Sequence, residues 1–80
     1  RNYKVVSDAL GDAGSPLVLN TPLAVLRARP DEQLHVPDVE GAFNDLARRN
    51  ILAYDEQAKT YSWGPEAAAL KAYRECLDRY

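Results

Sequence analysis

The architecture of this chain is set by residues 36–63, VPDVEGAFNDLARRNILAYDEQAKTYSW. In its first half, apolar side chains recur at intervals of three and four residues, at Val39, Ala42, Phe43, Leu46 and Ala47. This spacing places them on one face of a helix, so we predict a helix over 37–49 that is buried on one side. Pro37 suits the first turn of that helix, and Asn50 suits the left-handed residue that ends it.

The second half of this stretch has the pattern of a β-hairpin. Two β-type runs at 51–54 and 60–63 flank a polar connection at 55–59. A connection of this length is typical of a hairpin with a longer loop. Because side chains alternate along a strand, Tyr61 and Trp63 are expected to share one face of the hairpin.

Upstream of residue 36, the sequence predicts two helices with a short strand between them. The first helix begins at Asn2 and is expected to end near 11–14, where two glycines disfavour its continuation. The apolar run 17–19 is bounded by turn residues and predicts a strand that pairs with a later one. A second helix is predicted over 22–29. The residues that cap or delimit it are Asn20 or Thr21, Pro22 and Pro30.

A last helix is predicted after the hairpin, beginning at 64–66. Its apolar stripe, which we expect to pack back onto the domain, consists of Leu70, Tyr73, Leu77 and Tyr80. Its charged residues are expected on the solvent side, in the i, i+4 pairs Lys71 with Glu75, Arg74 with Asp78, and Glu75 with Arg79.

Composition limits the classes of protein to which the chain can belong. It has 80 residues, of which 46% are hydrophobic and 28% charged, so we expect one globular domain over 1–80. The formal charge of −2 provides no general attraction to phosphate. No apolar run approaches the roughly 18 residues that span a bilayer, and the single Cys76 cannot form an internal disulfide. These features favour a cytoplasmic or nuclear protein without a membrane segment.

The chain begins at Arg1 and contains no methionine, so we expect it to be a fragment of a larger protein.

The order of the predicted elements is that of a winged helix-turn-helix domain. Residues 42–55, AFNDLARRNILAYD, followed by 59–63, KTYSW, resemble the recognition helix of such domains running into the wing. The final helix resembles the extra helix of winged-helix modules attached to AAA or STAND-type ATPases. The resemblance extends over about residues 17–63. It implies an α+β fold with a three-helix core, a short strand and a hairpin wing, plus an extra C-terminal helix.

In winged-helix domains, the third helix commonly enters the DNA major groove while the wing touches phosphate or the minor groove. On this alternative, helix 37–49 and wing 51–63 would bind double-stranded DNA, with or without sequence specificity. The residues that would bind it are Asn44, Arg48, Arg49 and Lys59. The polar face of the same helix also carries the acidic residues Asp38, Glu40 and Asp45. They would face a surface with about one negative charge per 1.7 Å, so we rank DNA binding second.

No pattern in the sequence predicts catalysis, a metal site or a cofactor. His35 and Cys76 are isolated, whereas a zinc site needs about four donors and a catalytic thiol needs a positioned base. The adjacent carboxylates at 31–32 and 55–56 are in predicted loops, without the buried setting that separates two pKa values. We therefore expect a protein that is not an enzyme.

The main prediction is a regulatory winged-helix interaction module that acts through protein–protein or inter-domain contacts. Its candidate contact residues are the aromatic side chains Tyr54, Tyr61 and Trp63. Exposed together on an acidic domain, such aromatics would form a protein contact surface.

Overall fold

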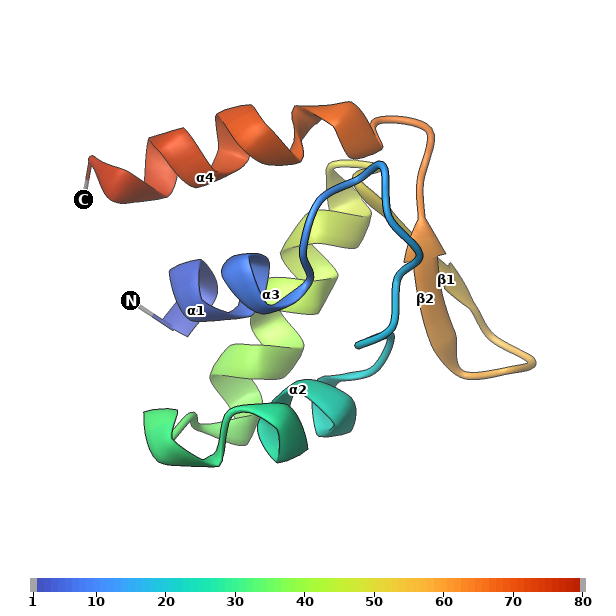
Figure 1. Cartoon of the computed structure of the whole chain (residues 1–80). Coiled ribbons are helices and arrows are strands. Elements are labelled where there is room, and N and C mark those ends of the chain that lie inside the picture. Colours follow the sequence, from blue (N-terminus) through green and yellow to red (C-terminus); the bar gives the residue numbers. More distant parts are fainter. Residues whose placement is uncertain (1, 80) are drawn as a thin grey trace.

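The structure, a computed structural model, describes residues 2–79. Over this range the chain is an α+β domain in which three helices precede a two-stranded antiparallel hairpin and a fourth helix follows it (Figure 1). The helices are α1 (Asn2–Ala9), α2 (Pro22–Ala28), α3 (Val36–Arg48) and α4 (Leu70–Asp78). The strands are β1 (Leu52–Asp55) and β2 (Thr60–Trp63). Single 3₁₀ turns occupy Pro30–Glu32 and Ala67–Ala69.

The central element is α3, because α1, α2 and β1 all pack against it. Val39, Ala42, Phe43 and Leu46 are at most 1% exposed, which confirms the predicted apolar stripe, while Ala47 is half-buried. The other elements complete the core with Val6, Leu10, Val25, Ile51, Leu52, Leu70 and Tyr73. A small chain must bury its apolar area efficiently, and here α1, α2 and β1 are arranged around one helix.

Local sequence signals set the ends of α2 and α3. The Thr21 hydroxyl accepts a hydrogen bond from the Ala24 amide at 3.1 Å, so Thr21 is the cap of α2. Asn50 has a φ of 62° and ends α3 in the predicted left-handed conformation. The helix itself begins and ends one residue before the predicted range 37–49.

The predicted hairpin is confirmed, with its first strand shifted by one residue. Tyr54 pairs with Tyr61, and Leu52 pairs with Trp63. At the turn, the Asp55 carboxylate accepts hydrogen bonds from the backbone amides of residues 57 and 58 at 2.9 and 3.2 Å. This local bonding favours the turn conformation over continued strand.

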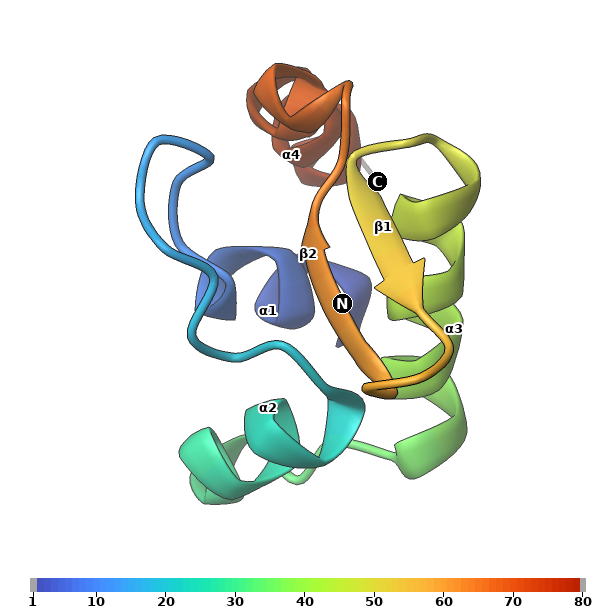
Figure 2. The same ribbon diagram turned by 90° about the vertical axis from the view of Figure 1, so that its right-hand side faces the viewer.

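The predicted strand at 17–19 is wrong. The loop that contains this segment runs beside β2 (Figure 2). Within residues 2–79 a single backbone hydrogen bond joins them, from the Tyr61 amide to the carbonyl of Asn20, one residue after the predicted strand, at 2.8 Å. The Asn20 amide donates to the Val18 carbonyl at 3.0 Å. This three-residue turn bends the segment out of the extended conformation that a strand ladder requires.

Both terminal helices differ from their predicted bounds. α1 ends at Ala9, before the predicted 11–14, and Gly11 adopts a φ of 77°, which a continuing helix does not allow. The last helix begins as a 3₁₀ turn and becomes α-helical at Leu70. In its predicted stripe, Leu70 and Tyr73 are buried and Leu77 is half-buried, while Tyr80 lies outside the described residues.

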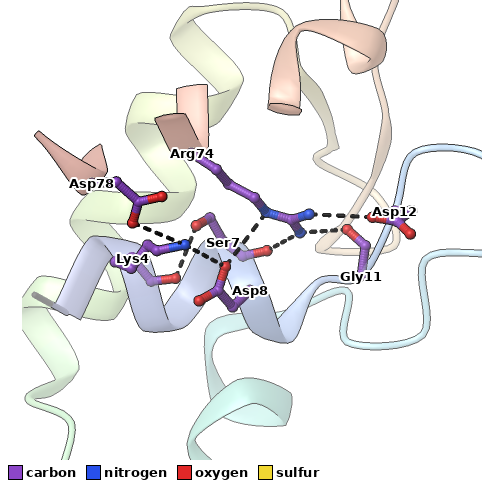
Figure 3. A network of polar contacts seen from close by, with 7 residues as sticks. All are labelled: Lys4, Ser7, Asp8, Gly11, Asp12, Arg74 and Asp78. Atoms are coloured by element: carbon purple, nitrogen blue, oxygen red, sulfur yellow. Dashed lines mark hydrogen bonds and ion pairs between the residues drawn. The ribbon is translucent and has the colours of Figure 1, made fainter. Parts of the chain in front are cut away.

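Arg74 does not lie on the solvent side as predicted, because it crosses from α4 to the C-terminal end of α1 (Figure 3). One guanidinium nitrogen donates to the carbonyl oxygens of Ser7 and Gly11, and another donates to Asp12 at 3.3 Å. The end of a helix carries unsatisfied carbonyls and partial negative charge. Arg74 therefore closes α1 and fastens α4 to it.

A second ion pair joins the same two helices. Lys4 of α1 lies 3.3 Å from Asp78 of α4, and 3.1 Å from Asp8 on its own helix. The Asp8 carboxylate also lies 3.7 Å from Arg74. Arg74 and Asp78 thus both have partners on α1, and the predicted pair between them is replaced by contacts between helices (Figure 3).

We expect Arg74→Ala to lower the free energy of unfolding by about 1–3 kcal/mol, because carbonyls at the end of α1 lose a charged donor. Arg74→Lys should recover only part of the loss, since an ammonium cannot reproduce the fork of the guanidinium. Urea denaturation measures both. Lys71→Ala, at an exposed position of the same helix, is the control and should change stability by less than about 0.5 kcal/mol. Equal losses for Arg74→Ala and Lys71→Ala would contradict this role.

Gly64 lies where the end of β2 passes the end of α3, and it has no room for a side chain. A Cβ there would be 2.4 Å from the backbone oxygen of Asn50, an atom that cannot rotate away. We expect Gly64→Ala to destabilise the fold by at least about 2 kcal/mol in the same assay. Gly14→Ala is the matched control, because its Cβ would meet no described atom within 4 Å. A Gly64→Ala variant as stable as the parent chain would show that the junction is not tight.

Candidate functional site

A groove of about 410 Å³ lies between α3 and the hairpin. We call it the α3–hairpin groove. Figure 2 looks towards the elements that form it, namely α3, the hairpin and the start of α2. Its lining residues are Pro22 of α2, Glu40, Asn44 and Ala47 of α3, and Tyr54, Lys59 and Tyr61 of the hairpin.

Two tyrosines whose rings contact each other at a tilt belong to the hairpin wall of this groove. The ring of Tyr61 lies 4.8 Å from that of Tyr54 and 4.8 Å from that of Phe43 in the core, measured between centroids. Its hydroxyl donates to Asn44 at 3.4 Å. Burial, with smaller contributions from Tyr54 and Glu40, raises the pKa of Tyr61, so this hydroxyl stays protonated at neutral pH. Tyr54 is 48% exposed and offers an accessible aromatic surface.

Asp45, on the other side of α3, is not on the exposed polar face where the sequence placed it. It is 8% exposed, because α4 covers this side of α3 with Tyr73. Its carboxylate accepts hydrogen bonds from the Tyr73 hydroxyl at 2.8 Å, from Arg49 at 3.2 Å and from Arg48. Burial alone would raise the pKa of Asp45, but the hydrogen bonds from Tyr73 and Arg48 and the charge of Arg49 hold it below its usual range.

The same contacts fix the positions of both arginines. Arg48 and Arg49 are paired with the one carboxylate of Asp45, and the Arg49 guanidinium also lies 5.1 Å from the centroid of the Tyr73 ring. Tyr73 has a raised pKa, owing to burial first and to its bond with Asp45 second, so it remains a hydrogen-bond donor. The single carboxylate of Asp45 therefore balances one of the two positive charges at this end of α3, and the side chains of Arg48 and Arg49 are 79% and 57% exposed.

The four residues that the sequence predicts to bind DNA lie in two separate places in the structure. Asn44 and Lys59 line the α3–hairpin groove, whereas Arg48 and Arg49 face Asp45. The groove itself contains the carboxylate of Glu40. The cations of α3 and of the hairpin therefore lie in two separate places, and each place also contains a carboxylate.

The three aromatic residues that were predicted to contact a protein partner also lie in two separate places. Tyr54 and Tyr61 line the groove. Trp63 does not: it is half-buried, and its indole nitrogen donates to the Ser15 carbonyl at 2.7 Å. Trp63 thereby fastens the loop after α1 to the end of β2.

Sequence reasoning missed three parts of this surface. It treated Glu40 as one more charge on a polar face, although Glu40 and Ala47 are spaced four and three residues from Asn44 and so had to lie beside it. Pro22 appeared only as a helix-starting residue. Its place in the groove depends on how α2 packs against α3, which no local pattern indicates.

A second groove, of about 500 Å³, lies among α1, α3 and α4. Its lining is mainly apolar and includes Tyr3, Tyr73, Cys76 and Leu77. Cys76 is exposed, with a free thiol. Among residues 2–79, no three His, Cys, Asp or Glu side chains are grouped so that they could hold a metal ion.

Comparison of the chain with protein-family models, curated proteins and solved structures finds no match. Within the described part of the chain, no helix is both long and apolar enough to cross a membrane.

We expect Asp45→Asn to cost about 1–3 kcal/mol of stability at pH 7, because the amide cannot accept from Tyr73 and both arginines as the carboxylate does. The folded-state pKa of Asp45 is lowered, so its stabilisation is present above the unfolded value of about 3.9 and disappears as the pH falls through the folded value. The difference between the variant and the parent chain should therefore shrink below about pH 4.

Urea denaturation at pH 7 and in acid measures this difference. Asp31→Asn, at an exposed position in the turn after α2, is the control and should leave the difference near zero at both pH values. If Asp45→Asn costs the same in acid as at pH 7, the ionised carboxylate does not provide the stabilisation.

Proposed function

We propose that this chain is a non-enzymatic winged-helix module that binds a protein partner, or another domain of its own protein, through the α3–hairpin groove. The order of its elements supports the winged-helix assignment, with α3 as the recognition helix and the hairpin as the wing. The loop at 17–20 takes the place of the short first strand, bonded to β2 through Asn20 and Tyr61. The additional helix is α4.

The observation that carries the proposal is the pairing of Arg48 and Arg49 with a buried carboxylate. A DNA-binding winged helix needs cations on this helix and its wing to offset the charge of the phosphates. In this chain the two arginines share the single carboxylate of Asp45, which balances one of their two charges, and the groove beside them contains Glu40. A duplex would meet a carboxylate where it needs a cation, whereas a protein surface can supply a matching group.

The composition of the groove also fits a protein partner. Tyr54, Tyr61, Pro22 and Ala47 supply apolar and aromatic area, and Glu40, Asn44 and Lys59 supply polar groups. Protein interfaces combine tyrosine-rich centres with polar edges in this way. Tyr54 is expected to make the main contact with the partner, because it is half exposed and its ring packs against that of Tyr61.

Titration of a labelled DNA duplex with the chain, followed by fluorescence anisotropy at low and moderate salt, tests the proposal against DNA binding. We expect no saturable binding at either salt concentration. Binding that weakens with salt, and weakens further in Arg48→Ala and Arg49→Ala, would contradict the proposal. It would establish the duplex as the ligand of α3 and the wing.

Affinity capture from the source cells tests the groove directly. A specific protein partner should be retained by the parent chain and lost with Tyr54→Ala and with Glu40→Lys. Lys71→Glu, on the exposed side of α4, is the matched surface control and should retain it. A retained protein that is indifferent to both groove variants would show that the contact surface lies elsewhere.

A further inference from the structure

We propose that the protein seated against the α3–hairpin groove is a second copy of this chain, related to the first by a two-fold axis. The inference rests on the proposed function, since it uses the same groove. It begins from two charges on opposite walls, Glu40 on the α3 wall and Lys59 on the hairpin wall. Within residues 2–79, neither side chain has an ion pair or a hydrogen bond.

Two-fold symmetry makes such a surface complementary to itself. In a two-fold interface every contact occurs twice: if one residue of the first copy touches a second residue of the other copy, the same two residues also touch with the copies exchanged. Glu40 of each copy can then meet Lys59 of the other, and the two ion pairs form together. A groove with walls of like charge would repel its own copy, and a polyanion such as DNA would satisfy only Lys59.

The surface between these charges suits mutual burial. Tyr54 is 48% exposed and lies in the groove with Ala47 and Pro22, so the apolar strip of one copy would cover that of the other. The Tyr61 hydroxyl already donates to Asn44 within its own chain. Covering it therefore leaves this donor paired, and the desolvation of the groove costs little.

Sedimentation equilibrium of the purified chain over a range of concentrations tests the inference. The parent chain should show a reversible monomer–dimer equilibrium. Glu40→Lys and Lys59→Glu should each weaken dimerisation by about ten-fold or more, because each puts like charges face to face at both reciprocal contacts. Lys71→Glu, which also reverses a charge but lies outside the groove, should leave the equilibrium unchanged.

Exchanging the two charges within one chain provides the sharpest test. The double variant Glu40→Lys with Lys59→Glu should dimerise like the parent chain, because its two ion pairs form again with their signs exchanged. The two single variants should form a heterodimer when mixed, although neither dimerises well alone. Circular dichroism of each variant shows that it is folded before it is compared.

A parent chain that stays monomeric at every concentration would overturn the inference, and so would a double variant that dimerises as poorly as the single ones. These failures differ from failure of the proposed function. A monomeric chain whose cellular partner is still lost with Glu40→Lys keeps the proposed function with a different protein in the groove. Duplex binding that depends on Arg48 and Arg49 would overturn the proposed function instead.

Discussion

Asp45 lies where α4 crosses α3, and its carboxylate accepts hydrogen bonds from Tyr73, Arg48 and Arg49. Apolar packing around α3 forms the core, and this contact determines which partners the charged residues at the end of α3 have. A buried carboxylate is tolerated only when it is paired, so the arginines and the tyrosine are held in fixed positions around it. The same contact joins the last helix to the core, in parallel with the Arg74 network at the end of α1.

This distribution of charge bears on what α3 and the hairpin can bind. The fold places α3 beside a hairpin, which in many proteins is a DNA-binding arrangement. In this chain the cations of α3 compensate an internal carboxylate, and the adjacent groove offers tyrosines, one acid and one base. The fold alone does not distinguish a DNA contact from a protein contact, so the proposed function is argued from the partners of each charged side chain.

Local signals in the sequence predicted the elements well and their long-range contacts poorly. The spacing of apolar residues such as Phe43 and Leu46 was enough to predict α3, and Asn50 was enough to predict where it ends. Both features depend on residues that are close in sequence. The strand at 17–19 failed because a local turn at Asn20 replaced the expected ladder. The burial of Asp45 and the reach of Arg74 could not be inferred, since both depend on where α4 packs.

The candidate site was predicted only in part, for the same reason. Asn44 and Lys59 were predicted as DNA-binding residues, and Tyr54 and Tyr61 as protein contacts; these four side chains line one groove. The central claim is that the Asp45 carboxylate is ionised and engaged by both arginines. Titration of the Asp45 side-chain carboxyl by carbon-13 NMR tests it most directly. The account predicts a pKa below the ordinary value of about 3.9, because the hydrogen bonds from Tyr73 and Arg48 and the charge of Arg49 outweigh the effect of burial, and a midpoint at or above that value would contradict it.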